Sequence, residues 1–132
     1  MVIVDSNIIL DILDSDPNWS PWSSQQLRQL SDAHDLAINP IIYSEISIRF
    51  STQATLDEAV AELGLLILDI PLEAAFVAGK AFVVYRRRGG TKGKILADFF
   101  IGAHAAVLGC PLITRDPRSY FTYFSGLTLI AP

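Results

Sequence analysis

The sequence predicts an α/β fold in which a parallel five-stranded sheet lies between layers of helices, and two observations indicate it. Short apolar runs alternate along the chain with segments of helical periodicity, which is the pattern of strand–helix–strand units. The apolar runs are also continuous rather than alternating, as expected for strands that helices cover on both faces. With 132 residues and 51% hydrophobic side chains, residues 1–132 are expected to form one domain with a dense core.

Five short apolar segments are the expected strands, at residues 2–4, 36–39, 65–68, 111–114 and 127–130. In helix-covered parallel sheets, the functional site lies beyond the carboxyl ends of the strands, where the strand order reverses. Asp5 follows the first of these segments, and Asp116 lies just beyond the fourth. The two carboxylates therefore meet if the first and fourth strands are neighbours in the sheet.

The periodicity of apolar residues predicts the connecting helices, at residues 6–13, 20–30, 40–50 and 55–63 and in the segments that begin at residues 72 and 95. Ser20 is placed to cap the second helix, with Pro21 at its first helical position. The segment from residue 95 is apolar on nearly all sides, so it must be buried. The helix that begins at residue 72 carries an apolar stripe made of Leu72, Ala75, Phe76, Gly79 and Val83.

The net charge of −4 disfavours a protein that binds nucleic acid through an overall positive charge. One stretch, RRRGGTKGK, is nevertheless strongly basic and contains Arg86, Arg87, Arg88, Lys92 and Lys94. These side chains, and Arg115 in the segment after the fourth strand, could contact nucleic-acid phosphates. The alternative for the basic stretch is a solvated helix end, because cations are favoured at a helix C-terminus.

Four carboxylates are candidates for a functional site, although each also has an ordinary structural explanation. Asp5 could cap the first helix, and Asp98 lies in the first turn of its helix, where the helix dipole favours an acid. Asp116 stands in a turn before Pro117. Glu45 could lie on the solvent face of its helix. Considered singly, each acid is explained without any chemistry.

Considered together, these acids favour a metal site. Asp98 and Glu45 have strongly apolar neighbours in the sequence, and a buried carboxylate requires a cation, hydrogen bonds or a proton. Four acids at one end of a sheet would repel one another unless a divalent cation compensates their charge. Oxygen ligands suit Mg²⁺ or Mn²⁺. One Cys and two His at unrelated spacing do not indicate zinc.

The other titratable residues are expected to be structural. His34 precedes the second strand in a loop, and His104 lies on a different helix face from Asp98. Asp69 is placed to cap the helix that follows it. Three acids at the end of the first helix are expected to be solvated, the first of them close to the site: Asp11, Asp14 and Asp16.

Four segments of the chain together resemble a known family: VIVDSNIIL at the start, PIIYSEI, KILADFFIGAHAAVLGCPLITRD, and the tail SYFTYFSGLTLIAP. In their order and spacing, the chain is similar to PIN-domain ribonucleases, specifically to the VapC toxins of bacterial type II toxin–antitoxin modules. The resemblance implies a PIN-like three-layer α/β/α sandwich. It also implies a sheet with the strand order 3-2-1-4-5, in which strands one and four are neighbours.

The same resemblance implies roles for individual residues. The acidic catalytic residues of the family fall on Asp5, Glu45, Asp98 and Asp116, of which Asp5, Asp98 and Asp116 would be ligands of Mg²⁺ or Mn²⁺. Polar positions that support the metal or the substrate fall on Ser6, Asn7 and Thr114. The chain departs from the family at Ser119, where many relatives carry another acid. A second metal ion would lack that ligand.

The implied function is that of an endoribonuclease toxin that uses Mg²⁺ or Mn²⁺ to hydrolyse RNA phosphodiester bonds. The implied partners are an RNA substrate, a VapB-like antitoxin, and a second copy of the chain in a homodimer. Two alternatives are a PIN domain that only binds RNA or a partner, and a receiver-like phosphoacceptor domain with Asp69 as its central aspartate. Without a long apolar run or signal-peptide pattern, and with one Cys, the protein is expected to be cytoplasmic and not membrane-bound.

Overall fold

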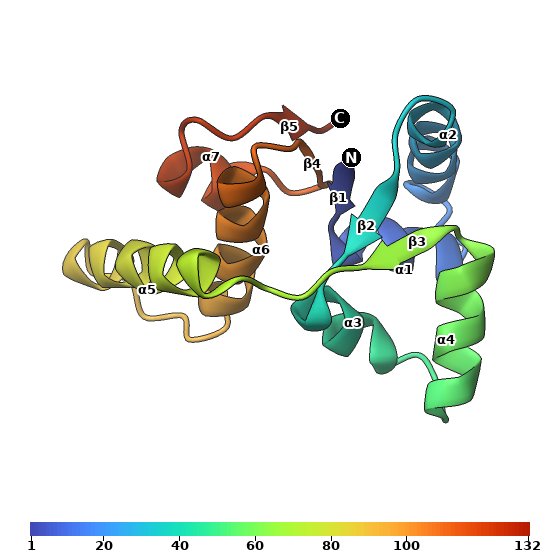
Figure 1. Cartoon of the computed structure of the whole chain (residues 1–132), viewed down its shortest axis with the longest axis horizontal. Helices are drawn as coiled ribbons and strands as arrows, with labels where there is room; N and C mark the ends of the chain where they lie inside the picture. The colour runs from blue at the N-terminus through green and yellow to red at the C-terminus, as the bar shows by residue number, and fades with distance from the viewer.

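The computed structural model describes residues 1–132 and contains a five-stranded sheet with the strand order β3-β2-β1-β4-β5 (Figure 1). All neighbouring strands run parallel. The strands are β1 (Val2–Val4), β2 (Leu36–Ile38), β3 (Leu65–Ile67), β4 (Leu112–Ile113) and β5 (Leu129–Ile130). This confirms the predicted α/β fold and strand order, and it makes β1 and β4 neighbours.

The strand order also excludes the receiver-like alternative. Receiver domains have the order 2-1-3-4-5, in which the third strand is central. Here β3 is an edge strand, and Asp69, which follows it, is exposed. An exposed aspartate beyond an edge strand does not occupy the central position that the receiver interpretation requires.

The central strands are covered on both faces. Every residue of β1, β2 and β4 is buried, as expected for continuous apolar strands between two layers of helices. The edge strand β3 exposes Leu66 and Ile67. A cluster of 23 buried hydrophobic residues forms the core on which the sheet and helices pack.

Seven helices connect and follow the strands: α1 (Ser6–Leu13), α2 (Ser20–Ser31), α3 (Pro40–Ser47), α4 (Gln53–Glu62), α5 (Leu72–Arg87), α6 (Ile95–Leu108) and α7 (Arg118–Tyr123). Helix α5 packs along α6, and Figure 1 shows both at the end of the molecule away from α2 and α4. Helix α6 buries six of its residues, which confirms that this apolar segment belongs to the core. None of the helices has the length and apolar character needed to cross a membrane.

Two predicted helix caps are wrong. Helix α2 begins at Ser20 itself, so Ser20 is not its N-cap. The preceding turn is held instead by Asp16, whose Oδ1 accepts hydrogen bonds from the backbone N–H groups of Asn18 and Trp19 at 2.8 and 2.9 Å. Asp69 does not cap α5, because that helix starts after Pro71 and has no side-chain cap.

The apolar stripe predicted for α5 is the exposed side of that helix. Leu72 is 88% exposed and Phe76 is 66% exposed, whereas the fully buried residues are Ala74 and Ala78. The small alanine side chains let α5 approach α6 closely, which is why they and not the larger residues face the core. The large apolar side chains of α5 are left on the surface.

Helix α7 was not predicted. It lies between β4 and β5 and contains the sequence RSYFTY, in which three of the six residues are aromatic. Its Tyr120 is 1% exposed, and Phe124, directly after the helix, is 8% exposed. The aromatic tail of the chain therefore belongs partly to the core, and its packing brings α7 to the carboxyl end of the sheet.

Candidate functional site

The predicted acids gather around one pocket at the carboxyl ends of the central strands. The pocket has a volume of about 640 Å³ and is lined by Glu45, Lys92, Lys94, Ile95, Asp98, Asp116, Arg118 and Ser119. Glu45 comes from α3, Asp98 from the first turn of α6, and Asp116 from the loop between β4 and α7. The fourth predicted acid, Asp5, does not line the pocket. It is buried at the end of β1, with only 4% of its surface exposed.

Asp5 both caps α1 and receives several side-chain donors. Its Oδ1 accepts a hydrogen bond of 2.8 Å from the backbone N–H of Ser6, which is the predicted cap. Its Oδ2 accepts hydrogen bonds from Thr114 Oγ1 at 2.7 Å and from Tyr120 OH at 2.9 Å. Burial raises the pKa of Asp5, and these hydrogen bonds oppose that rise by stabilising the ionised form. Asp5 is thus a buried carboxylate that several elements hold in place.

The predicted supporting residues all contact this carboxylate. Ser6 Oγ and Asn7 Nδ2 each lie 3.4 Å from an oxygen of Asp5. Asn7 Nδ2 also donates to Thr114 Oγ1 at 3.2 Å, and Asn7 Oδ1 accepts a 3.0 Å hydrogen bond from the backbone N–H of Arg115. The start of α1 and the end of β4 are therefore joined by a polar network centred on Asp5.

The negative charges of the Glu45 and Asp98 carboxylates are not fully compensated by hydrogen-bond donors or cations of the chain. Glu45 Oε1 is buried without a hydrogen-bond partner, and burial together with the charge of Asp5 raises the pKa of Glu45. For Asp98, burial and the charges of Asp5, Glu45 and Asp116 raise the pKa to about 7. Carboxylates that are both partly buried and close enough to repel one another are typical of an anionic site that favours a cation.

Asp116 differs from the other acids because a cation already accompanies it. Arg118 Nε donates to Asp116 Oδ1 at 3.0 Å, and Arg118 Nη2 donates to Oδ2 at 3.3 Å. This hydrogen bonding by Arg118 lowers the pKa of Asp116. Both side chains are exposed, the arginine by 88%. Such a pair adds little stability and is easily separated.

The donor set fits a hard divalent cation in chemistry and charge. All four acids offer oxygen ligands, which suit Mg²⁺ or Mn²⁺, and the unpartnered Glu45 Oε1 is a buried acceptor that a cation could satisfy. The side chains do not form a closed cluster, since no group of three lies close enough to hold an ion as it stands. Binding would therefore require the side chains of Glu45, Asp98 and Asp116 to move closer to one another and to Asp5.

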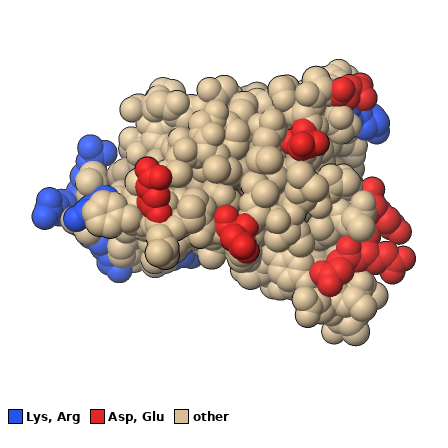
Figure 2. Space-filling model, viewed as in Figure 1, with Lys and Arg blue, Asp and Glu red and all other residues tan.

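The predicted basic residues divide into two sets. Lys92 and Lys94, in the loop before α6, line the pocket together with Arg118. Arg86, Arg87 and Arg88 are exposed around the end of α5 and do not line it. Figure 2 shows that Lys and Arg gather at the end of the molecule where α5 ends in Figure 1. The two lysines are thus the part of the basic stretch that borders the acids.

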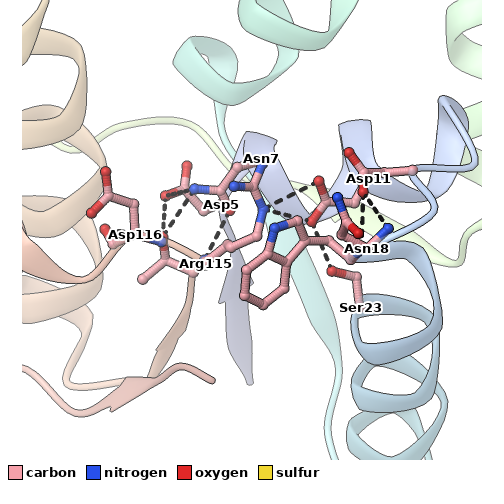
Figure 3. A network of polar contacts seen from close by, with 10 residues as sticks. Asp5, Asn7, Asp11, Asn18, Ser23, Arg115 and Asp116 are labelled. Atoms are coloured by element: carbon pink, nitrogen blue, oxygen red, sulfur yellow. Dashed lines mark hydrogen bonds and ion pairs between the residues drawn. The ribbon is translucent and has the colours of Figure 1, made fainter.

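Arg115 is held by an acid on the first helix. Its Nε lies 2.9 Å from Asp11 Oδ2, and its guanidinium lies over the Trp19 ring, 5.4 Å from the ring centre. Figure 3 shows the Arg115 side chain reaching from beside Asp116 towards Asp11. The prediction that Asp11 is solvated is wrong, because it is 3% exposed and also accepts a 3.0 Å hydrogen bond from Ser23 Oγ. Asp14 is exposed, as predicted, and pairs with Arg49.

His104 has a structural role, as the sequence predicts. It is 1% exposed, and its Nδ1 lies 3.1 Å from Nδ2 of Asn39. Since an amide NH₂ can only donate, Nδ1 must be the acceptor in this bond. Asn39 Oδ1 in turn accepts a hydrogen bond from the backbone N–H of Ile42 and caps α3. This pair joins α3, which carries Glu45, to α6, which carries Asp98. His34 is exposed in the loop before β2.

Sequence reasoning missed two residues that contact the acids. Arg118 lines the pocket and Tyr120 donates to Asp5, and both lie on the unpredicted helix α7. Burial, then the charges of Asp5 and Asp98, keeps the pKa of Tyr120 well above its usual value, so its hydroxyl remains a donor. The signal available in the sequence was their position, two and four residues after Asp116.

Comparison with known proteins places these features in a family context. A sequence model of the family described as PIN domain matches residues 2–124. No curated protein sequence is similar enough to the chain to count as a relative.

Solved structures that resemble the chain share its fold at low sequence identity. VapBC2 from Rickettsia felis, bound to a DNA fragment from its promoter, gives a TM-score of 0.75 at 19% identity, over 99% of this chain and 98% of that chain. VapBC-1 from nontypeable Haemophilus influenzae gives 0.74 at 19% identity, with the same coverage. FitAcB from Neisseria gonorrhoeae gives 0.67 at 19% identity, over 98% of this chain and 96% of that chain.

Proposed function

The chain belongs to the PIN domain family, and from this premise we propose that it is a Mg²⁺- or Mn²⁺-dependent endoribonuclease. One observation carries the proposal: Glu45, Asp98 and Asp116, from three different elements, border one pocket near the buried Asp5. Burial, and then the negative charges of Asp5, Glu45 and Asp116, raise the pKa of Asp98 to about 7. An arrangement of this kind is unfavourable for the free protein and becomes favourable when a divalent cation binds.

Asp5, Asp98 and Asp116 are the proposed metal ligands, with Glu45 as the fourth catalytic acid. A bound Mg²⁺ or Mn²⁺ supplies an activated water and stabilises negative charge on the reacting phosphate. Asp98 must lose its proton before it can act as a ligand. Asp116 must exchange Arg118 for the cation, and the exposure of that ion pair makes the exchange easy.

The basic side chains that line the pocket are suited to bind the substrate. Lys92, Lys94 and Arg118 line the same pocket as the acids, so an RNA phosphate in the pocket would lie between cationic groups and the metal site. Arg118, once released from Asp116, has a guanidinium free to bind a phosphate oxygen. Arg86, Arg87 and Arg88 lie farther along the same end of the molecule and would contact neighbouring phosphates. Arg115 is less suited to this role, because Asp11 already engages its guanidinium.

We further propose that the protein is the toxin of a VapBC-type module and that a VapB-like antitoxin is its partner. The support is the similarity of the whole chain to structures described as VapBC complexes. Another similar structure is described as a toxin–antitoxin complex from Klebsiella pneumoniae. The toxin would act on RNA inside the cell, and the antitoxin would suppress that activity.

A homodimer is the proposed assembly, and the exposed stripe of α5 is the surface proposed for it. Leu72, Phe76 and Val83 form an apolar face on one helix. Glu73 lies in the first turn of α5, and Arg86 and Arg87 lie in its last turn. Two copies of α5 packed antiparallel would bury the apolar faces and place acidic first turns beside basic last turns.

The test of the proposed activity is cleavage of end-labelled structured and single-stranded RNAs with Mg²⁺, with Mn²⁺ and with a chelator. We expect cleavage that requires the metal and is lost in Asp98→Asn. Asp69→Asn is the matched control, because Asp69 is an exposed aspartate outside the pocket, and it should cleave like the unchanged protein. RNA binding without cleavage under every condition would contradict the proposal. It would favour a PIN domain that only binds RNA or a partner.

A further inference from the structure

The phenol of Tyr120 is a buried polar group that the proposed activity does not yet use. The side chain is 1% exposed, and its hydroxyl donates a 2.9 Å hydrogen bond to Asp5 Oδ2. A buried tyrosine hydroxyl normally finds a partner, and this one has as its partner a proposed metal ligand 115 residues away in the sequence.

A glycine on α6 makes this contact possible. A Cβ added at Gly102 would lie 3.0 Å from Cδ1 of Tyr120 and 2.8 Å from the ring of Phe124. Because Gly102 has no side chain, both rings pack directly on the backbone of α6. The close approach seats α7 at the carboxyl end of the sheet with the Tyr120 hydroxyl directed at Asp5.

The donors to Asp5 Oδ2 come from separate elements. Thr114 Oγ1, at the end of β4, donates at 2.7 Å, Tyr120 OH on α7 donates at 2.9 Å, and Asn7 Nδ2 on α1 lies 3.4 Å away. Ser6 N–H holds the other oxygen, Oδ1, at 2.8 Å. A carboxylate held from three elements cannot rotate freely. Loss of the Tyr120 hydroxyl would remove one of the two short contacts to Oδ2.

We propose that Tyr120 is a positioning residue that holds Asp5 in the orientation used for metal binding. This inference rests on the proposed function, since it assigns Tyr120 a role at the same metal site. Hydrogen-bond partners of metal ligands orient those ligands, and their loss usually weakens metal binding by about 10- to 100-fold. The alternative is that Asp5 merely satisfies the buried hydroxyl of an aromatic residue in the core.

The test is the dissociation constant for Mn²⁺, measured by calorimetry on the full chain as the unchanged protein, Tyr120→Phe and Tyr123→Phe. Tyr120→Phe keeps the ring that packs on Gly102 and removes only the hydroxyl. Tyr123→Phe is the matched control on the same helix, because Tyr123 packs against Phe99 and its hydroxyl forms no hydrogen bond with any of the acids. We expect Tyr120→Phe to weaken Mn²⁺ binding about tenfold or more and Tyr123→Phe to leave it unchanged. Equal affinity in Tyr120→Phe and the unchanged protein would overturn the assignment.

A second measurement, made in chelator, tests the contact itself. Unfolding of the single variants Tyr120→Phe and Asp5→Asn and of the double variant forms a double-mutant cycle. We expect clearly non-additive effects, and additive effects would overturn the proposal. The two readouts separate the possible failures. If the unchanged protein binds no Mn²⁺, the proposed metal-dependent function fails, and the role of Tyr120 falls with it. If the unchanged protein and Tyr120→Phe bind Mn²⁺ equally, only the role of Tyr120 fails.

Discussion

Arg115 Nε lies 2.9 Å from Oδ2 of Asp11, although 104 residues separate the two in the sequence. The Asp11 side chain is 3% exposed and that of Arg115 is 33% exposed, so the aspartate depends on this arginine for most of its charge compensation. The pair fastens the segment that contains Asp116 to α1. It is a structural contact beside the proposed site, and it limits what Arg115 can do there.

Arg115→Gln should therefore lower stability. The change leaves a buried carboxylate without its cation, and we expect the free energy of unfolding to fall by about 2–3 kcal/mol, less than for a fully buried pair because Arg115 is partly exposed. Urea denaturation measures this. Arg49→Gln is the control, since its pair with Asp14 is exposed and should contribute less than about 1 kcal/mol. Equal losses of unfolding free energy in the two variants would show that the Arg115–Asp11 pair contributes no more stability than an exposed ion pair.

The affinity for Mn²⁺ should rise with pH up to about 7 and then level off. The pKa of Asp98 is raised to about 7, and only the ionised form binds a cation. Below that pH, one bound proton must be displaced, so affinity should fall up to tenfold for each pH unit. Calorimetric titrations between pH 5.5 and 8 measure the profile. An unchanged affinity over this range would contradict the assignment of Asp98 as a ligand.

The same raised pKa predicts how stability depends on pH without metal. The folded state holds the Asp98 proton more tightly than the unfolded chain, so this contribution is complete below about pH 4 and is lost as the pH rises through about 7. Asp98→Asn should therefore be more stable than the unchanged protein at pH 8 in chelator. We expect a gain of roughly 1–2 kcal/mol, a figure reduced for solvent screening. A less stable variant would show that the ionised Asp98 carboxylate does not destabilise the folded protein.

RNA binding should depend on salt through the basic residues of the pocket. Each phosphate contact that is removed should reduce the slope of log affinity against log salt by about 0.7 for single-stranded RNA. Lys92→Gln, Lys94→Gln and Arg118→Gln should each show this change, measured by fluorescence anisotropy in the Asp98→Asn background, in which we expect no cleavage. Arg28→Gln, an exposed arginine on α2 outside the pocket, should keep the slope. Slopes unchanged in all variants would place the RNA elsewhere.

Gly102→Ala should disturb α7. The new methyl group would meet the ring of Phe124 at 2.8 Å, which is too close for an ordinary contact. Overpacking of this kind lowers stability by about 1–3 kcal/mol, and the better helix propensity of Ala recovers up to about 1 kcal/mol. Thermal unfolding measures the net loss. A variant as stable as the unchanged protein would mean that α7 can shift without cost.

Phe76→Glu should give a monomer. It places a charge in the middle of the exposed α5 stripe, where the proposed dimer would bury it. Sedimentation of both proteins over a range of concentrations measures the change. Phe121→Glu is the matched control, because Phe121 is 76% exposed and lies on α7, outside the α5 stripe. If the unchanged protein is a monomer, or if Phe76→Glu leaves the dimer intact, the proposal that the α5 stripe forms the dimer interface is wrong.

The sequence predicted the sheet well because its strands are continuous apolar runs that end at polar residues. It also predicted that Asp5 and Asp116 meet, because the carboxyl ends of parallel strands lie at one edge of the sheet. Glu45 and Asp98 lie on helices, and the family resemblance assigned them to the same site. The α5 stripe shows the limit of such patterns. Its sequence is apolar on several sides, and the choice of buried side depends on how closely Ala74 and Ala78 fit against α6.

Long-range pairs account for the other misses. Asp11 resembles a solvated acid at a helix end until Arg115 and Ser23 are brought beside it by the fold. The contact of the Tyr120 hydroxyl with Asp5 was equally unpredictable, because nothing in the local sequence of the aromatic tail indicates that this hydroxyl reaches Asp5. The Tyr120 contact depends on the packing of α7 against Gly102, and no local pattern in the sequence predicts that packing.

The central claim, that the acidic pocket is a divalent-metal site, is tested most directly by anomalous diffraction from crystals grown with Mn²⁺. We predict a strong Mn²⁺ peak in contact with Asp98 in the pocket bordered by Glu45 and Asp116, absent from crystals of Asp98→Asn. Crystals with Mn²⁺ in excess and no peak in this pocket, or a peak that persists in Asp98→Asn, would contradict the account.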